Sequence, residues 1–542
     1  MAQFINAKED IVPEAIDGVI SASDGRLVRL DGYPYIRVVL RSDWDDSKVA
    51  ILSGGGSGHE PAHAGFVGKG MLTAAVCGDV FASPSVDAVL AGIRAVTGAA
   101  GCLLIVKNYT GDRLNFGLAA ARARELGLRV KMVVVEDDIA LPDIARPRGI
   151  AGTLFVHKVA GAVAEAGGDL AAVTKAATEA ARGAVSIGMS LSSCTVPGSP
   201  PEDRIADGSM EVGLGIHGEP GAEQLPFETA TRAIDMLVAR LEPHLTEPRY
   251  AVLVNNLGAT TALEISIMTE ALRRSSIGGK LSHIIGPAPM MTALDMHGVS
   301  LSLLPLSPET LALLGAETEA PAWPGLHTFD APQAVAMPET HADMTPPPLH
   351  HDEHAAILRE TCAALLASEA DLNALDAKSG DGDTGSTVAG AARALSGQID
   401  TLPLADLGQL FPAISRSLTQ TMGGSSGVIL AIFFSAAGEA MAGGASAAMA
   451  LKAGLRRVEE VGGAQRGDRT MIDALSPALD VLPEGLSAAA KAARNGADET
   501  ARLERARAGR ASYVNADLLR GHPDPGAEAV ARVFERLAAN IG

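Results

Sequence analysis

Three aspartates lie close together in a glycine-rich stretch, residues 376–387, in the last third of the chain. Asp376, Asp381 and Asp383 fall within eight residues of one another. Their carboxylates would repel each other unless cations lay between them, and hard cations such as Mg²⁺ take oxygen ligands completed by water and substrate phosphates. Residues 384–387 add hydroxyl and backbone N–H groups that suit phosphate oxygens. The stretch therefore predicts a metal–nucleotide loop, and the alternative is an ordinary polar turn.

Two further glycine-rich segments carry a histidine each. Residues 53–61 read Ser-Gly-Gly-Gly-Ser-Gly-His-Glu-Pro and match neither the dinucleotide fingerprint nor the Walker A loop. They predict a turn lined by bare amides that could hold a small oxygenated ligand beside His59, or else a capping or core histidine. Residues 213–221 place His217 among four glycines, so that a ligand could approach closely. This histidine is a candidate base, metal ligand or nucleophile, with a structural role as the alternative.

Lys107 and Asp112 form a third candidate group, in the polar segment 107–113. The alternative without a catalytic role is a surface ion pair between the two residues, which contributes little to stability. If Asp112 lies at the same sheet edge as His59, it becomes a candidate base for a hydroxyl proton.

Apolar runs at residues 49–52, 102–107 and 130–135 precede polar loops and then helical patterns at 117–126 and 153–165. This alternation is typical of βαβ units in a parallel sheet. Ligands of such sheets bind at the carboxyl ends of the strands, where the loops that carry His59 and Lys107 would lie. The first region of the chain is therefore predicted to be an α/β subdomain over residues 1–188.

A second α/β subdomain is predicted over residues 189–330, followed by a Pro-rich linker at 331–350 that favours extended backbone. From 351 to 542 the pattern changes to one helix after another, and an all-α domain is predicted. Its expected helices include 354–372, 388–396, 404–421, 428–442, 445–461 and 487–506.

The amino-acid composition indicates which classes of binding partner and which cellular compartment to expect. The net charge is −20, and 47% of residues are hydrophobic. An acidic globular chain argues against nucleic acid and anionic membrane surfaces as partners, since both require Lys/Arg patches. The four cysteines are widely spaced, and no signal peptide or membrane-spanning run is expected. A cytoplasmic location is therefore predicted.

Four segments together resemble the dihydroxyacetone kinase family, in its single-chain ATP-dependent form. They are Gly-Gly-Gly-Ser-Gly-His-Glu-Pro at 54–61, Gly-Ile-His-Gly-Glu-Pro-Gly at 215–221, Gly-Asp-Gly-Asp-Thr-Gly at 380–385 and Gly-Gly-Ser-Ser-Gly at 423–427. They occur in the family's order, and the resemblance covers essentially the whole chain. It implies a K-type substrate region followed by an L-type nucleotide domain built as a barrel of helices.

For the substrate region the resemblance implies covalent capture of the substrate. His217 would bind the carbonyl of dihydroxyacetone, or of glyceraldehyde, as a hemiaminal. Asp112 would be the base and His59 its assistant. The residues implied to hold the hydroxyls are Gly56, Ser57, Gly58, His59, Lys107 and Asp112.

For the nucleotide domain the resemblance implies two Mg²⁺ ions on Asp376, Asp381 and Asp383, which would lie across the phosphates of the co-substrate ATP. The residues implied to surround the nucleotide are Thr384, Gly385, Ser386, Thr387, Ser425, Ser426, Gly462, Met471, Arg510, Asp524, Pro525 and Gly526. Because substrate and nucleotide lie on different domains, the linker must let one domain dock on another, and a homodimer is expected.

Two departures from the family pattern leave alternatives open. Residues 515–522, Asn-Ala-Asp-Leu-Leu-Arg-Gly-His, replace a family run near the C-terminus, which leaves the nucleotide contacts of that segment open. The segment at 287–291, with His297, is also unusual and could border the substrate. A kinase for a four-carbon ketose such as erythrulose is therefore one alternative. The others are a non-catalytic ketose-binding sensor, a kinase with cyclisation of flavin nucleotides as a side reaction, and a kinase that depends on a phosphocarrier protein. The last normally has separate K and L chains.

Overall fold

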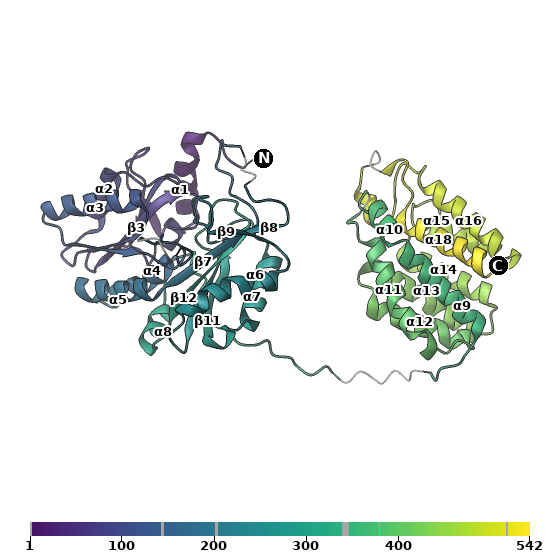
Figure 1. Ribbon diagram of the computed structural model, residues 1–542. Helices are drawn as coiled ribbons and strands as arrows, with labels where there is room; N and C mark the ends of the chain where they lie inside the picture. Colours follow the sequence, from purple (N-terminus) through teal and green to yellow (C-terminus); the bar gives the residue numbers. More distant parts are fainter. Residues whose placement is uncertain (1–2, 142–145, 201–203, 339–345, 379, 516–518) are drawn as a thin grey trace. The chain divides into compact units, whose positions relative to one another are not determined.

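The computed structural model describes residues 3–141, 146–200, 204–338, 346–378, 380–515 and 519–542. The chain forms two compact units, Met1–Ala334 and Val335–Gly542. The first is α/β and the second is helical, so the predicted fold class is confirmed (Figure 1). The domain limits predicted at residues 188, 330 and 350 stay predictions. Within the described ranges, none of the helices is long and apolar enough to cross a membrane.

The first unit contains two sheets, and within the described residues the first has the strand order β1-β2-β4-β3-β5-β6. Strands β3, β4, β5 and β6 are parallel to one another, as predicted, but β1 pairs antiparallel with β2 and β2 with β4. The sheet is therefore mixed. Its strands are β1 Leu27–Arg29, β2 Val38–Arg41, β3 Ala50–Ser57, β4 Ala74–Val80, β5 Cys102–Lys107 and β6 Val130–Val135.

The second sheet has the order β13-β11-β10-β12-β7-β8-β9 in the part of the chain that is described. Most of its pairs are antiparallel, and β10 with β11 is parallel. Its strands are β7 Val185–Ser190, β8 Ser209–Val212, β9 Glu223–Pro226, β10 Tyr250–Asn256, β11 Leu281–Pro289, β12 Gly298–Pro305 and β13 Leu326–Thr328.

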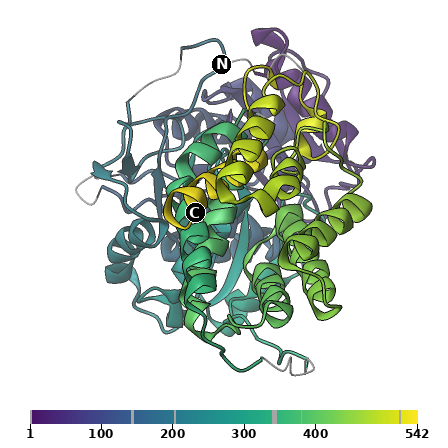
Figure 2. The same cartoon turned by 90° about the vertical axis from the view of Figure 1, so that its right-hand side faces the viewer.

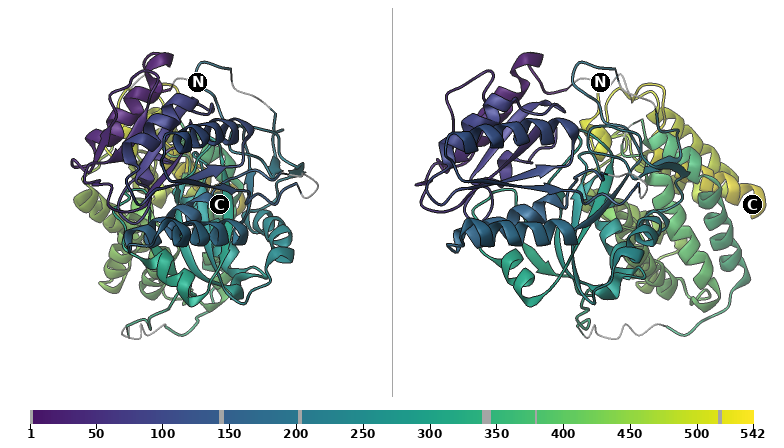
Figure 3. Two further views of the ribbon diagram at one scale, coloured as in Figure 1. Left: turned by 90° about the vertical axis from the view of Figure 1, so that its left-hand side faces the viewer. Right: turned by 60° about the vertical axis from the view of Figure 1, so that its left-hand side comes forward.

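Helices cover both faces of each sheet and separate the two (Figure 3). α2 (Val86–Val96) and α3 (Thr110–Glu125) pack on the outer face of the first sheet. α4 (Thr153–Glu165) is buried nearly all round, because its core cluster contains residues of both sheets. The remaining helices of this unit are α1 Ile11–Ser21, α5 Leu170–Gly183, α6 Ala230–Leu241, α7 Ala262–Arg274 and α8 Pro308–Gly315.

Strand β10 shows how the second sheet is buried on two sides. Ala251 and Leu253 face the core shared with α4, whereas Tyr250, Val252 and Val254 face the core formed with α6 and α7. Alternate residues of a strand point to opposite faces, so a strand covered on both sides reads as a continuous apolar run.

The second unit consists of green and yellow helices in Figure 2. α9 packs on α11, neighbouring helices pack in order from α11 to α15, α15 packs on α18, and α18 packs back on α9. The helices thus close into a ring, in agreement with the expected barrel. They are α9 Asp352–Ala367, α10 Glu369–Asp376, α11 Thr384–Gln398, α12 Leu407–Thr421, α13 Gly424–Ala442, α14 Ala447–Gly462, α15 Ile472–Val481, α16 Leu486–Thr500 and α18 Pro525–Asn540.

Two sequence predictions about local structure were wrong. The helix expected at 354–372 is broken at Ser368, whose hydroxyl donates to the carbonyl of Ala364 and which caps the end of α9. The glycines expected in a turn after Leu52 belong to β3, because Gly54 pairs with Val76 of β4 in the sheet. A Cβ at Gly54 would lie 2.2 Å from the Val76 carbonyl oxygen, so the close strand contact requires glycine.

Candidate active site

His59, Lys107 and Asp112 meet at the carboxyl edge of the first sheet. β3 ends at Ser57 just before His59, the adjacent parallel strand β5 ends at Lys107, and Asp112 lies in the first turn of α3. All three side chains are buried, with exposed fractions of 0%, 0% and 2%. Ionisable groups are rarely buried without a partner or a function, so this cluster is a candidate site.

The polar ends of Lys107 and Asp112 converge on the bare backbone of Gly55. A Cβ built on Gly55 would lie 2.8 Å from Lys107 Nζ and 3.4 Å from Asp112 Oδ2. Any side chain there would collide with the ammonium group. The second glycine of the run is therefore required by the site itself.

The imidazole of His59 has one unprotonated ring nitrogen. Its Nδ1 lies 2.8 Å from the Thr292 carbonyl oxygen, which only accepts, so Nδ1 carries the proton. Burial, followed by the charges of His217 and Lys107, lowers the pKa of His59 well below its usual value. The ring is therefore neutral, and Nε2 is an acceptor. Among the described residues, neither this Nε2 nor Asp112 Oδ1 has a hydrogen-bond partner, although both atoms are buried.

His217 reaches the same place from the second sheet, on the loop between β8 and β9. Its ring centroid lies 4.4 Å from that of Tyr109, 4.7 Å from that of His59 and 5.3 Å from that of Phe81, all edge to face. The imidazole is 17% exposed. The structure thus brings together the four residues of the predicted catalytic and hydroxyl-binding set that carry ionisable side chains.

The loop between β11 and β12 of the second sheet hydrogen-bonds to the segment that follows β3 of the first sheet. The Leu294 backbone N–H donates to the Gly58 carbonyl at 2.8 Å, and the Thr292 N–H donates to the His59 carbonyl at 3.2 Å. The side chain of Asn255 holds this loop through the backbone of Met290 and Met291. The segment expected to border the substrate, 287–291, therefore leads directly into the contact with His59.

His297, which was expected with that segment, has a different neighbour. Its Nε2 lies 3.0 Å from Glu264 Oε1, beside the capping box that begins α7. Its predicted place beside the substrate stays a prediction.

The remaining residues of the glycine run make backbone contacts. The Ser57 hydroxyl donates to the Gly78 carbonyl at 2.9 Å. A Cβ at Gly56 would lie 2.7 Å from the Ala82 nitrogen, and one at Gly58 would lie 2.8 Å from the Phe81 ring. These glycines let the segment around Phe81 approach the site, and their predicted contact with the substrate stays a prediction.

Sequence reasoning missed four residues of this site. His63, Phe81, Tyr109 and Thr292 lie against the predicted residues, and none belongs to a pattern that indicates chemistry. The available signal was proximity in sequence, since His63 lies two residues beyond the segment 53–61 and Tyr109 lies within the segment 107–113. Thr292 contributes through a backbone carbonyl, which no side-chain pattern reveals.

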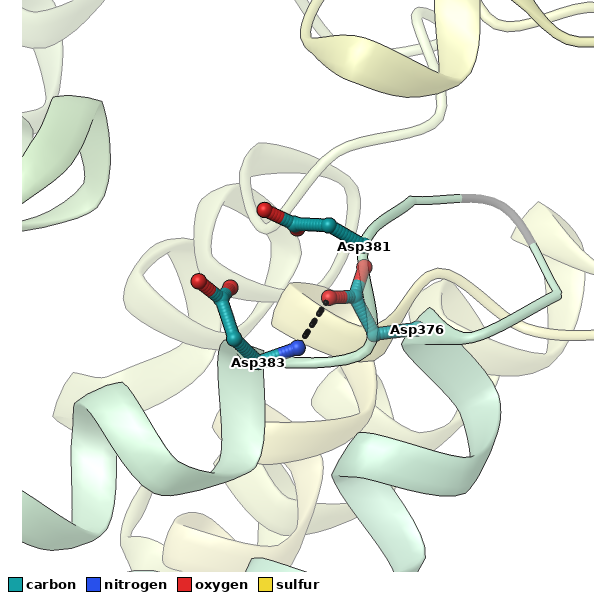
Figure 4. Close-up of side chains that lie close together, drawn as sticks. All are labelled: Asp376, Asp381 and Asp383. Atoms are coloured by element: carbon teal, nitrogen blue, oxygen red, sulfur yellow. Dashed lines mark hydrogen bonds between the residues drawn. The ribbon is translucent and has the colours of Figure 1, made fainter. Parts of the chain in front are cut away.

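In the second unit the three aspartates of the predicted metal site do come together. Each offers a carboxylate oxygen, and these atoms lie within 4.8 Å of one another. Asp376 ends α10, Asp381 lies in the following loop and Asp383 caps α11 (Figure 4). Asp376 is buried, whereas Asp381 and Asp383 are exposed. Oxygen donors from two exposed carboxylates and one anchored carboxylate suit Mg²⁺, which keeps several waters.

The loop is shaped around one oxygen of Asp376. Its Oδ2 accepts hydrogen bonds from the backbone N–H groups of Gly382, Asp383 and Thr384 at 3.1, 3.0 and 3.2 Å. A Cβ at Gly380 would lie 2.4 Å from the other oxygen, Oδ1. The glycines of the motif therefore allow the loop to close over this carboxylate.

The predicted phosphate-binding residues occupy helix ends. Thr384, Gly385, Ser386 and Thr387 form the first turn of α11, and Ser426 lies in the first turn of α13. Free N–H groups at such positions attract anions. Gly462 ends α14, which runs antiparallel to α13 after the short connection 443–446, so it lies at the same end of that helix pair as Gly424. Nothing is described of the Ser425 side chain.

The other predicted nucleotide contacts lie near the metal loop. Met471 caps α15, Asp524 caps α18, and a Cβ at Gly526 would lie 3.2 Å from that of Met471. Lys378 Nζ lies 3.4 Å from His522 Nδ1, which links the aspartate loop to this turn. Pro525 begins α18. Arg510 begins a short 3₁₀ helix, but its side chain and residues 516–518 of the altered segment lie outside the described residues.

Comparison with known proteins identifies matches along both units. The Dak1 domain matches residues 17–322 and the DAK2 domain residues 378–539. A dihydroxyacetone kinase from Citrobacter freundii is 49% identical, over 99% of this chain and 98% of that protein. A putative 3,4-dihydroxy-2-butanone kinase from Solanum lycopersicum is 43% identical, with the same coverage. The crystal structure of the C. freundii kinase with AMP-PNP and Mg²⁺ matches with a TM-score of 0.71 at 48% identity, over 99% of both chains.

Proposed function

Since this chain belongs to the dihydroxyacetone kinase family, we propose that it transfers the γ-phosphoryl group of ATP to a hydroxyl of dihydroxyacetone, and also accepts glyceraldehyde. The observation that carries the proposal is the cluster of buried His59, Lys107 and Asp112 with partly exposed His217, in which two buried acceptor atoms have no partner among the described residues. Phosphoryl transfer depends on positioning and charge neutralisation, and this cluster supplies the first.

We propose that His217 holds the substrate covalently. The Nε2 lone pair adds to the carbonyl carbon as the C=O π bond breaks. The carbonyl oxygen takes up a proton to become a hydroxyl, and the resulting imidazolium releases its Nδ1 proton, which gives a neutral hemiaminal. The Nδ1 side of the ring faces the Glu219 carboxylate at 3.4 Å, which leaves the lone pair on Nε2. Ligands without a carbonyl, such as glycerol, cannot form this bond.

Asp112 is the proposed base, with His59 as its assistant. A hydroxyl that donates to Asp112 Oδ1 or His59 Nε2 would satisfy a buried acceptor, which is otherwise costly. Lys107 beside Asp112 would orient a second substrate oxygen. A general base must lie within hydrogen-bond reach of the proton that it removes, and two buried acceptors without a partner among the described residues support this assignment.

Two Mg²⁺ ions are the proposed metal complement, held by Asp376, Asp381 and Asp383. Bound Mg²⁺ would neutralise the phosphate charge of ATP. The chain's own part is to anchor Asp376 through three backbone N–H groups and to present the first turns of α11 and α13 to phosphates.

An acceptor panel tests the function. Purified protein, Mg²⁺ and ATP are incubated with dihydroxyacetone, glyceraldehyde, erythrulose, aldoses and glycerol, and ADP is measured. We expect ADP with dihydroxyacetone and its loss in Asp381→Ala, which also excludes a non-catalytic sensor. Absence of acceptor-dependent ADP with every three- and four-carbon ketose would refute the proposal. Turnover with ATP and no added protein excludes the phosphocarrier-dependent alternative.

The covalent step has its own test. With dihydroxyacetone labelled with ¹³C at its carbonyl, we expect the bound carbon to lose its ketone resonance in the parent protein and to keep it in His217→Ala. A ketone resonance for the bound substrate of the parent would show that the adduct does not form.

A four-carbon ketose is the second candidate substrate, favoured by the S. lycopersicum relative named for 3,4-dihydroxy-2-butanone. The ratio of kcat/KM for erythrulose to that for dihydroxyacetone decides between the two.

We also propose a homodimer in the cytoplasm, where ATP is present and the four free cysteines stay reduced. The docking of substrate and nucleotide domains requires that the proposed linker at 331–350 allow movement. Sedimentation velocity at several concentrations tests the dimer.

A further inference from the structure

His63 contacts Lys107 in the interior of the first unit. The distance from His63 Nε2 to Lys107 Nζ is 2.7 Å, and the two side chains are 4% and 0% exposed. Among the described residues, the Lys107 ammonium group makes no hydrogen bond besides this contact with His63, and it forms no ion pair with Asp112. The buried Lys107 ammonium group thus contacts the imidazole of His63 although the Asp112 carboxylate is close.

The direction of this hydrogen bond follows from charge. Burial, followed by the charges of Lys107, His157 and His59, lowers the pKa of His63 well below its usual value. The ring is therefore neutral, and Nε2 accepts from the Lys107 ammonium group while the proton lies on Nδ1. That Nδ1 is buried without a hydrogen-bond partner in the described residues. The imidazole is held by packing, with its centroid 5.3 Å from that of His157.

Three polar atoms surround the same point in the site. A Cβ on Gly55 would lie 2.8 Å from Lys107 Nζ, 3.4 Å from Asp112 Oδ2 and 3.8 Å from His63 Nε2. His63 thus approaches Lys107 at the place where Asp112 also approaches it. Without the imidazole, the ammonium group would be free to move onto the carboxylate.

We propose that His63 is a positioning residue for the phosphoryl transfer, which holds Lys107 away from Asp112 and directs the remaining N–H groups of Lys107 at the substrate. The inference rests on the proposed function. A close Lys107–Asp112 pair would occupy the lone pairs that the base needs, because a carboxylate in an ion pair accepts from the ammonium group. It would also remove a donor from the substrate oxygen.

Four substitutions separate positioning from simple packing. In His63→Gln the amide oxygen can occupy the place of Nε2, whereas in His63→Asn it falls short and in His63→Leu there is no acceptor. His157→Leu is the matched control, because His157 is 0% exposed, packs edge to face against His63 and hydrogen-bonds to Ser53 at 3.1 Å. Each variant is assayed as the full chain for kcat and KM with dihydroxyacetone and with ATP, and its thermal unfolding is recorded.

We expect kcat/KM for dihydroxyacetone to fall roughly 10- to 100-fold in His63→Asn and His63→Leu, the size expected from displacement of a reacting group. The KM for ATP should stay within about twofold, because His63 lies in the substrate unit. His63→Gln should recover at least about tenfold of the loss. His157→Leu should lower the unfolding temperature as much as His63→Leu and lose less than about threefold in activity.

Parental rates in His63→Asn and His63→Leu would overturn the inference. So would equal losses in His63→Gln, His63→Asn and His157→Leu, because the effect would then be one of packing. If His63→Leu does not fold, the comparison of Gln with Asn decides alone. Turnover by the parent protein reports separately on the proposed function.

Discussion

Glu219 holds His217 through both oxygens of its carboxylate. Oε2 accepts a hydrogen bond from the His217 backbone N–H at 2.9 Å, and Oε1 lies 3.4 Å from Nδ1. Burial opposes ionisation, but the hydrogen bonds and charge of His217 lower the pKa of Glu219 to about 2. The carboxylate reaches back because Gly215 has no side chain, since a Cβ there would lie 2.2 Å from Oε2.

Glu219→Ala should therefore impair the substrate step selectively. Without the carboxylate, the imidazole of His217 can rotate and exchange tautomers, so Nε2 is no longer fixed as the nucleophile. We expect kcat/KM for dihydroxyacetone to fall roughly 100-fold, with a smaller loss in Glu219→Gln, and little change in the KM for ATP. Steady-state kinetics with each substrate varied in turn measure this. Equal effects on both substrates would indicate a general loss of structure instead.

Gly55→Ala should abolish activity and also lower the unfolding free energy, because Gly55 has a φ of +156°, which residues with a side chain rarely adopt. The new methyl group would lie 2.8 Å from Lys107 Nζ and would displace it from the site. We expect a loss of at least about 100-fold in kcat. Gly117→Ala is the control, because no atom lies within 4 Å of a Cβ there and the residue is inside α3. That change should raise stability by about 0.5–1 kcal/mol at unchanged activity.

The sequence allowed the chemistry-bearing residues to be found more reliably than their local structure. His59, Lys107 and Asp112 could be placed at one sheet edge because parallel strands end together. Gly54 could not be assigned to β3, since glycine has low strand propensity and the close approach to Val76 was invisible in the sequence. The break at Ser368 was missed because the apolar pattern of the expected helix 354–372 continues across this residue.

The supporting contacts of the site could not be predicted at all. Thr292 lies 233 residues from His59 in sequence and contacts it through a backbone carbonyl. His63 contacts Lys107 across 44 residues. Long-range pairs of this kind depend on how the two sheets pack, which periodicity within a segment does not encode.

Asp376 and Asp381 should respond differently to the same substitution. Asp376→Asn weakens an acceptor of three backbone N–H groups, so we expect a loss of about 1–3 kcal/mol in unfolding free energy besides weaker Mg²⁺ binding. Asp381→Asn alters an exposed side chain and should leave stability within about 0.5 kcal/mol. Both should need at least about tenfold more Mg²⁺ for half-maximal ADP formation.

Urea unfolding and Mg²⁺ titration of the two variants measure these effects. EDTA should stop ADP formation by the parent protein, and added Mg²⁺ should restore it. An unchanged Mg²⁺ requirement in both variants would place the metal elsewhere.

Asp524 should make the helical unit less stable as the pH rises. Burial, partly offset by the Ala527 N–H and by Arg469, raises its pKa from 3.8 to about 6. The folded state therefore binds this proton more tightly than the unfolded state does. The stability that it contributes is present below about pH 4 and is lost progressively up to about pH 6, by up to about 3 kcal/mol.

Asp524→Asn should remove this dependence and keep the cap, because the amide oxygen can still accept from the Ala527 N–H that Asp524 Oδ2 binds at 2.8 Å. We expect parent and variant to have similar unfolding free energies near pH 4 and the variant to be more stable near pH 7. Urea unfolding of both proteins across that range measures the difference. Parallel pH profiles would mean that Asp524 has the same pKa in the folded and the unfolded chain. A variant that is as stable as the parent near pH 4 but less stable near pH 7 would mean that the charge, through Arg469, contributes more than burial opposes.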